Sequence, residues 1–111
     1  MNLRFLRAAE EDAGITIEKL DRMRYGWGDD FDELMQEAVT SIGANPRMFP
    51  RTEDGPDEPE NREYYIERFE YRVIYAIWKD EVVIVAVLHA ARRPGVWVHR
   101  LTEIDSPEDS A

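Results

Sequence analysis

Hydrophobic positions in the second half of the chain first follow a period of two and then form a continuous run, which predicts two adjacent strands. Residues 71–78 show the period of two, and the polar residues 79–81 follow as a turn. Residues 82–88 are apolar throughout and too few for a buried helix of ordinary length. Such a segment is typical of a central strand with both faces covered. A preceding strand at residues 64–69 is expected to join this hairpin.

In the first half of the chain the hydrophobic spacing is helical. A short edge strand is predicted at residues 2–6, and a helical segment is predicted from about residue 8. A second helix is clearer, because apolar residues recur at i, i+3, i+4 and i+7 between Phe31 and Ile42. Acidic residues crowd its N-terminus, where the helix dipole favours negative charge. It is expected to end before Pro46.

The link at residues 25–28 is short, so the two helices are expected to form an antiparallel hairpin. The fold class that follows is α+β, with an N-terminal helical hairpin packed on one face of a small, mostly antiparallel sheet of three or four strands. Residues 1–101 are expected to form a single domain, and the acidic tail 102–111 is expected to be disordered.

Residues 51–61 combine two prolines, one glycine and five acidic residues, which excludes a strand or a helix interior. We expect a mobile, solvated loop there. The carboxylates leave divalent metal binding and phosphate mimicry as alternative interpretations.

Composition fits one small cytoplasmic module. The chain has 111 residues and no cysteine, which excludes disulfides and thiol chemistry. Its two histidines leave little material for a metal site, and we expect no cofactor. No stretch approaches the roughly 20 apolar residues of a membrane span, and the N-terminus turns acidic too early for a secretory signal.

The formal net charge of −10 argues against direct, sequence-specific DNA binding, because nucleic-acid binders usually carry a basic face. Charge is unevenly distributed, however. Residues 62–101 contain seven basic and five acidic side chains and form the only net positive segment. A local basic surface there can act despite an acidic remainder, since charges are screened beyond about 8 Å at physiological salt.

Four residues that follow the last predicted strand are candidates for binding an acidic or aromatic partner. They are Arg92, Arg93, Trp97 and Arg100. Arginine and tryptophan dominate binding energy where they are desolvated. Ion pairing with the acidic residues of the chain is the alternative for the arginines, and capping of a small core is the alternative for the tryptophan.

A catalytic interpretation is also open. RNA cleavage needs positive charge around the phosphate, with a general acid and a general base on either side. The residues available to provide this charge and the acid-base groups are Arg68, Arg72 and His89, together with Arg92 and Arg93. Alternatives are ion pairs of Arg68 and Arg72 with neighbouring glutamates, and a structural hydrogen bond of His89.

Several segments, taken in order, carry a resemblance to a known family. They are Ala9-Glu10-Glu11, Gly26-Trp27-Gly28 with Phe31, Ile42 to Pro46 with Phe49-Pro50, Arg62-Glu63, Arg68-Phe69-x-Tyr71-Arg72-Val73-Ile74-Tyr75, and Val85 to His89 leading to Arg92-Arg93-Pro94 and Trp97. In this order and spacing the chain resembles the RelE/ParE superfamily of toxins from type II toxin-antitoxin systems, and within it the ParE (plasmid stabilisation) branch. Glu70 stands where the family usually has proline.

The resemblance implies a growth-regulating toxin neutralised by a cognate, ParD-like antitoxin that folds over its surface. Trp27, Met48 and Trp78 are large groups outside the predicted core pattern, and we expect them to contact that antitoxin. The ParE branch implies inhibition of DNA gyrase without catalysis. The alternatives are a ribosome-dependent mRNA endonuclease, as in the RelE branch, and a non-toxic relative that acts only as a binding module. The low basic count and the absence of Lys-rich strands favour gyrase.

Overall fold

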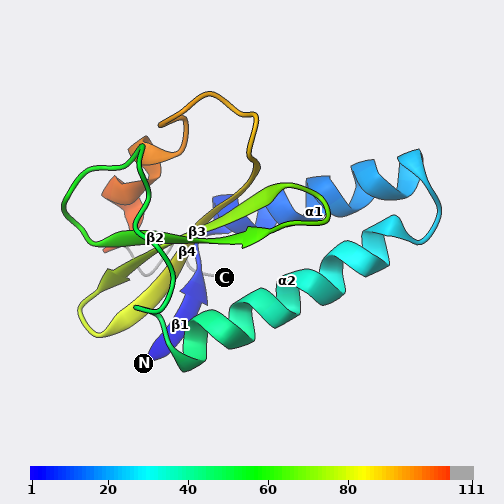
Figure 1. Cartoon of the computed structure of the whole chain (residues 1–111). Coiled ribbons are helices and arrows are strands. Elements are labelled where there is room, and N and C mark those ends of the chain that lie inside the picture. The colour runs from blue at the N-terminus through cyan, green and yellow to red at the C-terminus, as the bar shows by residue number, and fades with distance from the viewer. Residues whose placement is uncertain (106–111) are drawn as a thin grey trace.

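Two helices lie on one side of a four-stranded sheet, and the C-terminal segment lies on the other side (Figure 1). The structure is a computed structural model and describes residues 1–105. In chain order the elements are β1 (Asn2–Phe5), α1 (Arg7–Met23), α2 (Trp27–Ala44), β2 (Asn61–Ile66), β3 (Tyr71–Trp78), β4 (Glu81–His89) and the 3-10 helix η1 (Val98–Glu103).

The strand order in the sheet is β1-β4-β3-β2. β1 runs parallel to β4, and the two other pairings are antiparallel, which confirms the predicted α+β fold and its mostly antiparallel sheet. β2 begins at Asn61, three residues earlier than the sequence predicted. Lys79 and Asp80 join β3 to β4 with φ values of 49° and 60°, the left-handed conformations that a tight hairpin turn requires.

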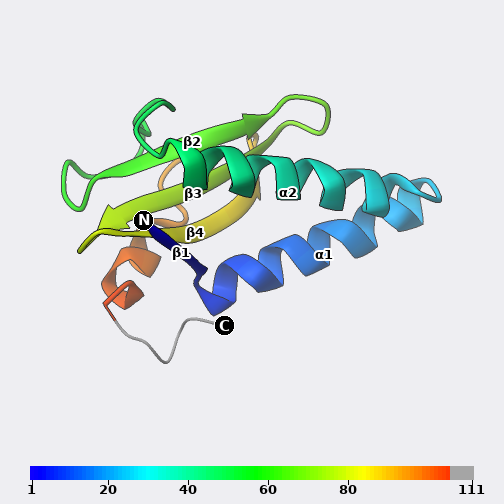
Figure 2. The ribbon, with the colours of Figure 1, turned by 90° about the horizontal axis from the view of Figure 1, so that it is seen from below.

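The helical hairpin packs its apolar faces onto one side of the sheet, as Figure 2 shows. Phe31, Met35, Ala38 and Ile42 of α2 are buried there. Gly26, with φ of 93°, turns the chain between the helices, and α2 begins at Trp27 immediately after it. The tip of the hairpin projects beyond the sheet in both views.

The opposite face of the sheet is covered by the segment that follows β4. Trp97 and Ile104 pack there against a second group of buried strand residues, which includes Ile74, Val83 and Val85. This arrangement confirms that both faces of β4 are covered.

The same packing corrects the predicted start of the tail. Thr102 and Glu103 belong to η1, and Ile104 is only 3% exposed. Arg4 donates a hydrogen bond from Nη2 to the carbonyl of Ile104 and ties this end to β1. One buried isoleucine inside an acidic, Pro- and Ser-containing sequence is a weak signal, so the sequence placed the boundary too early. The rest of the predicted tail, residues 106–111, lies outside the described residues.

The acidic loop between α2 and β2 is folded on itself around Asn61, which corrects the prediction of a solvated linker. Asn61 is 1% exposed, and its Nδ2 donates to the carbonyls of Pro56 at 2.8 Å and Pro59 at 2.7 Å. Thr52 donates from its hydroxyl to Asn61 Oδ1. Hydrogen bonds from polar side chains therefore give the loop an internal structure that its composition does not predict.

Candidate protein-interaction site

Asp54 connects the loop, the sheet and the C-terminal segment. Its carboxylate accepts two hydrogen bonds from the guanidinium of Arg72 on β3, at 2.7 and 3.0 Å. It also accepts the indole Nε1–H of Trp97 at 2.9 Å and the backbone N–H of Gly95 at 2.9 Å. A Cβ on Gly55 would lie 2.7 Å from the Trp97 ring, so the loop reaches this position only with glycine there.

The Asp54 and Arg72 charges are both largely buried and stabilise each other. Hydrogen bonds from Arg72 hold the pKa of Asp54 well below its usual value, although burial acts in the other direction. Burial also opposes the charge on Arg72, but hydrogen bonds to Asp54 and Glu63 outweigh it and raise the pKa of Arg72. Breaking such a pair by removing one partner is expensive, because it leaves an uncompensated charge.

Arg72 was predicted as a candidate catalytic cation, and the structure places it between two carboxylates. Its side chain is 13% exposed, and Nε and Nη2 bind Glu63 at 2.8 and 3.2 Å in addition to Asp54. Its ion-pair partners are Asp54 and Glu63, not its neighbours in sequence, Glu67 and Glu70. Since its donors are engaged by two carboxylates, Arg72 is not available to a phosphate.

The other members of the candidate catalytic set lie in different environments. Arg68 lies in the turn between β2 and β3 and donates to Asp30 of α2 at 2.9 Å. The Nδ1 of His89 accepts the backbone N–H of Ala91 at 3.0 Å, which is the structural role that the sequence analysis left open. Among the described residues, no hydrogen bond or ion pair joins Arg68, Arg72 and His89 to one another. Each of the three side chains therefore has its own partners within the protein.

Tyr75 on β3 is buried and donates its hydroxyl to the carbonyl of Pro46 at 2.5 Å. Burial raises the pKa of Tyr75 to about 12. A phenol held in this way keeps its proton at neutral pH, so it fits a structural role better than general base catalysis.

Trp97 was predicted to contact the target, and the structure places it in the core. Trp97 is completely buried and fills the core on the second face of the sheet. It therefore caps the core, the alternative that the sequence left open. A single tryptophan after Pro94-Gly95 lies outside any periodic segment, so the sequence did not distinguish these roles.

Arg100 is likewise engaged within the protein. Its Nη1 and Nη2 donate to the two oxygens of Asp12 at 2.6 and 3.2 Å, and Nη1 also reaches the carbonyl of Val85 at 3.0 Å. Asp12 Oδ2 in turn accepts the N–H of Val87 at 3.0 Å. The strand β1 ends opposite Ile84, and the register of β3 and β4 shifts at this point. Asp12 and Arg100 thus satisfy backbone groups of β4 where it loses its regular pairing.

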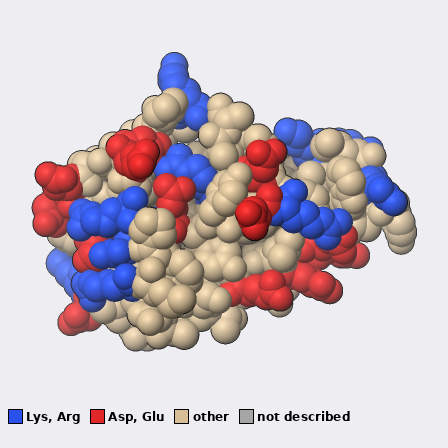
Figure 3. Space-filling model, in the orientation of Figure 1, with Lys and Arg blue, Asp and Glu red and all other residues tan. Residues whose placement is uncertain are grey.

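Arg92 and Arg93 are the two predicted target-binding residues that remain exposed. They lie between β4 and Trp97. Within residues 1–105, neither guanidinium has an acidic, carbonyl or aromatic partner. Figure 3 shows basic and acidic side chains interspersed on one face of the molecule, without a broad basic surface. The unpaired positive charge in this region is therefore confined to these two arginines and does not extend over a wide surface.

The residues predicted to contact an antitoxin do not form one surface. Trp27 is half-buried at the start of α2 and packs edge-on against Phe69. Met48 is 69% exposed and follows the end of α2, a helix of 18 residues. A helix of that length spans about 27 Å. Trp78 lies at the end of β3, where its Nε1 donates to Asp105 at 3.3 Å.

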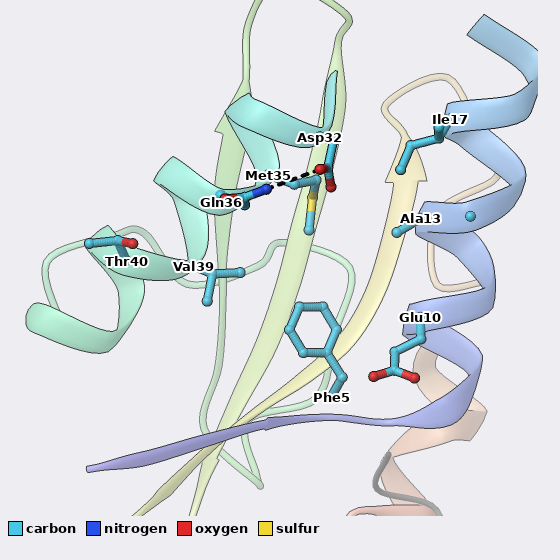
Figure 4. Close-up of a pocket in the computed structure, with 10 residues that line it drawn as sticks. Phe5, Glu10, Ala13, Ile17, Asp32, Met35, Gln36, Val39 and Thr40 are labelled. Atoms are coloured by element: carbon cyan, nitrogen blue, oxygen red, sulfur yellow. Dashed lines mark hydrogen bonds between the residues drawn. The ribbon is translucent and has the colours of Figure 1, made fainter. Parts of the chain in front are cut away.

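A groove between α1 and α2 was missed by the sequence analysis, which assigned its apolar residues to the core. Figure 4 shows Phe5, Ala13, Ile17, Met35 and Val39 around an opening of about 570 Å³. The small residues at positions 13 and 14 on α1 line this opening and leave it unfilled. That pair was the available signal in the sequence.

Polar and acidic side chains line the rim of this groove. Glu10 of α1 and Asp32 of α2 lie at its edge, and Gln36 donates to Asp32 at 3.0 Å (Figure 4). An apolar floor with an acidic rim has the composition of a site for an amphipathic, basic segment of another protein.

The fold and these exposed features define a small α+β protein suited to binding other proteins. Residues 3–94 match the family described as ParE toxin of type II toxin-antitoxin system, parDE. The match covers most of the chain, so the chain belongs to this family of toxins, and membership implies a cognate antitoxin as partner. A search of curated proteins finds no match.

Two further findings concern residues 1–105. No group of three or more His, Asp or Glu side chains in this part of the chain is placed to hold a metal ion. No helix in it is long and apolar enough to cross a membrane.

Proposed function

We propose that this toxin arrests growth by binding DNA gyrase in the cytoplasm, without catalysis, until its antitoxin covers it. One observation supports the proposed absence of catalysis. Arg72, the most central of the candidate phosphate-binding cations, is held by Asp54 and Glu63. An endonuclease needs donors directed at the developing charge on the phosphate, whereas the donors of Arg72 are engaged by two carboxylates.

Expression from a tightly controlled promoter tests this proposal. Growth arrest is expected with an induced DNA-damage response and intact mRNA. A RelE-like endonuclease would instead give rapid loss of translation and cleaved mRNA, and a non-toxic relative would leave growth unchanged. Either result would contradict the proposal.

Two substitutions make the same test sharper. Arg68→Gln removes an exposed guanidinium, and His89→Asn removes the titratable ring while its amide oxygen can still accept the Ala91 N–H. Both variants are expected to arrest growth as the unmodified chain does. A loss of roughly 100-fold or more with His89→Asn alone would indicate acid-base catalysis.

The antitoxin is proposed to dock in the groove between α1 and α2. The acidic rim and the net charge of −10 favour a basic, amphipathic helix as the occupant. Ala13 lies at the groove and is small, so Ala13→Arg would fill it and place a positive charge against a basic partner.

Calorimetric titration with the cognate antitoxin measures this effect. Ala13→Arg is expected to weaken binding at least about tenfold, equivalent to about 1.4 kcal/mol. Ala44→Arg, at the exposed end of α2, is the matched control and should bind as the unmodified chain does. Equal affinity of the two variants would exclude the groove as the docking site.

A further inference from the structure

Ten of the fourteen lysine and arginine side chains have a partner within the described part of the chain. Most form ion pairs, Arg51 binds a carbonyl, and Arg24 lies over the ring of Trp27. Across residues 1–105, the exceptions are Lys19, Arg22, Arg92 and Arg93. In a chain with 24 acidic and 14 basic side chains, these four cations are left without a partner among residues 1–105.

Two of these exceptions meet at one place. Lys19 on α1 and Arg92 after β4 line the same hollow of about 190 Å³, although they are far apart in sequence. Its remaining surface includes Tyr71, Val87 and Leu88 of the sheet, which are buried and give it an apolar floor. The hollow is therefore apolar below and positive at its rim.

The one carboxylate that lines this hollow does not cancel the positive charge. Asp12 is engaged by Arg100 at 2.6 Å and by the N–H of Val87 at 3.0 Å. Its charge is balanced by Arg100, so Lys19 and Arg92 keep their charges for a ligand.

Exposed apolar side chains continue from the hollow along α1. Ile15, which also lines it, is 64% exposed and lies one turn before Lys19. Met23 lies one turn after Lys19 and is 62% exposed. Residues four apart share one face of a helix, so Ile15, Lys19 and Met23 form an apolar and cationic stripe next to the hollow.

We infer that this hollow binds an acidic segment of the toxin's target protein. A carboxylate of that segment lies between Lys19 and Arg92, and a neighbouring apolar side chain packs on Ile15. This inference rests on the proposed function, since it assigns the surface by which the toxin meets its target. A phosphate backbone fits less well, because two cations above an apolar floor, in a chain this acidic, offer little to a polyanion.

Charge reversal tests the inference with a closely matched control. The double variant Lys19→Glu/Arg92→Glu changes the hollow. The double variant Arg22→Glu/Arg24→Glu makes the same change in net charge at two exposed cations near the C-terminal end of α1, which do not line it. All four side chains are exposed, so both variants should fold, which circular dichroism and thermal unfolding would verify.

The first readout is growth arrest on expression, which does not depend on the identity of the target. The hollow variant is expected to lose at least about tenfold in potency, and the control variant to retain it. Equal potency of the two variants would overturn the inference. A chain without growth arrest would overturn both the inference and the proposed function.

The second readout is inhibition of purified gyrase, and it separates the two proposals. If the unmodified chain leaves gyrase active while the hollow variant alone loses growth arrest, gyrase is wrong as the target and the hollow is right as the contact. Fluorescence anisotropy with labelled DNA, in the absence of gyrase, tests whether the hollow binds nucleic acid instead. Binding that only the hollow variant abolishes would overturn the peptide assignment.

Discussion

The indole of Trp97 donates a hydrogen bond to Asp54 over 2.9 Å, joining a buried tryptophan to the acidic loop 43 residues earlier in the chain. The same carboxylate holds Arg72 of β3. The loop and the C-terminal segment are thus fixed to the sheet by one side chain, and the arginine that resembled a catalytic group is part of that structural link.

Asp54→Asn is expected to lower the free energy of unfolding at pH 7 by about 3 kcal/mol, because it leaves Arg72 without one of its two carboxylates. The loss should depend on pH. The folded state holds the pKa of Asp54 well below its usual 3.8, so the stabilisation is complete above about pH 5, begins to fall below pH 3.8 and is lost as the pH falls through the lower pKa of the folded state. Denaturant unfolding at pH 7 and about pH 2 measures the difference.

Glu53→Gln provides the control for this prediction, because Glu53 is exposed in the same loop. It should change the free energy of unfolding by no more than about 0.5 kcal/mol. An Asp54→Asn difference that is equally large at both pH values would show that the carboxylate charge contributes nothing.

Trp97→Phe and Trp97→Ala separate the hydrogen bond from the packing of the indole. The phenylalanine variant loses the Nε1 donor and should cost about 1–2 kcal/mol, whereas the alanine variant leaves a cavity and should cost about 3–5 kcal/mol. Thermal unfolding checks both values. Full stability of Trp97→Ala would contradict the burial of this side chain.

Asp12 and Arg100 should be energetically coupled. Asp12→Ala, Arg100→Ala and the double variant form a cycle with an expected coupling energy of about 1–3 kcal/mol. Asp12→Ala should be the more damaging single change, because it also leaves the N–H of Val87 without its acceptor. Strict additivity in denaturant unfolding would show that the pair does not act as a unit.

Tyr75→Phe should remove the last tyrosine ionisation in an absorbance titration at alkaline pH. Burial raises the pKa of Tyr75 from 10.0 to about 12, so its protonated form stabilises the fold fully below pH 10, and this stabilisation is lost as the pH rises through 12. At pH 7 the loss of the hydroxyl should cost about 1 kcal/mol. A titration curve unchanged by the substitution would contradict this assignment.

The fold could be predicted from local patterns, and the site could not. The period of two at residues 71–78, the apolar run after it and the helical stripe from Phe31 to Ile42 each depend on neighbours in sequence, so the sheet hairpin and the helical hairpin were predicted correctly. Asp54 gives no such signal. Its partners lie 18 and 43 residues away, and its own segment shows only the composition of a solvated loop.

The roles of Trp97 and Arg100 were left open by the sequence for a related reason. These residues either contact another protein or pack within this one, and the outcome depends on which segment covers the second face of the sheet. The sequence left both outcomes open, and the structure resolves them in favour of the core for Trp97 and of an ion pair for Arg100. Arg92 keeps its predicted exposure because residues 90–94 lie on the surface, so its side chain remains available for binding.

The most direct measurement of the central claim is a titration of purified DNA gyrase with this protein, followed by supercoiling of plasmid DNA. A toxin that acts by binding should inhibit supercoiling, with an end point near one toxin per gyrase binding site when gyrase is well above the dissociation constant, and added antitoxin should restore activity. Unaffected supercoiling, together with mRNA cleaved by substoichiometric amounts of the protein on ribosomes, would contradict the account.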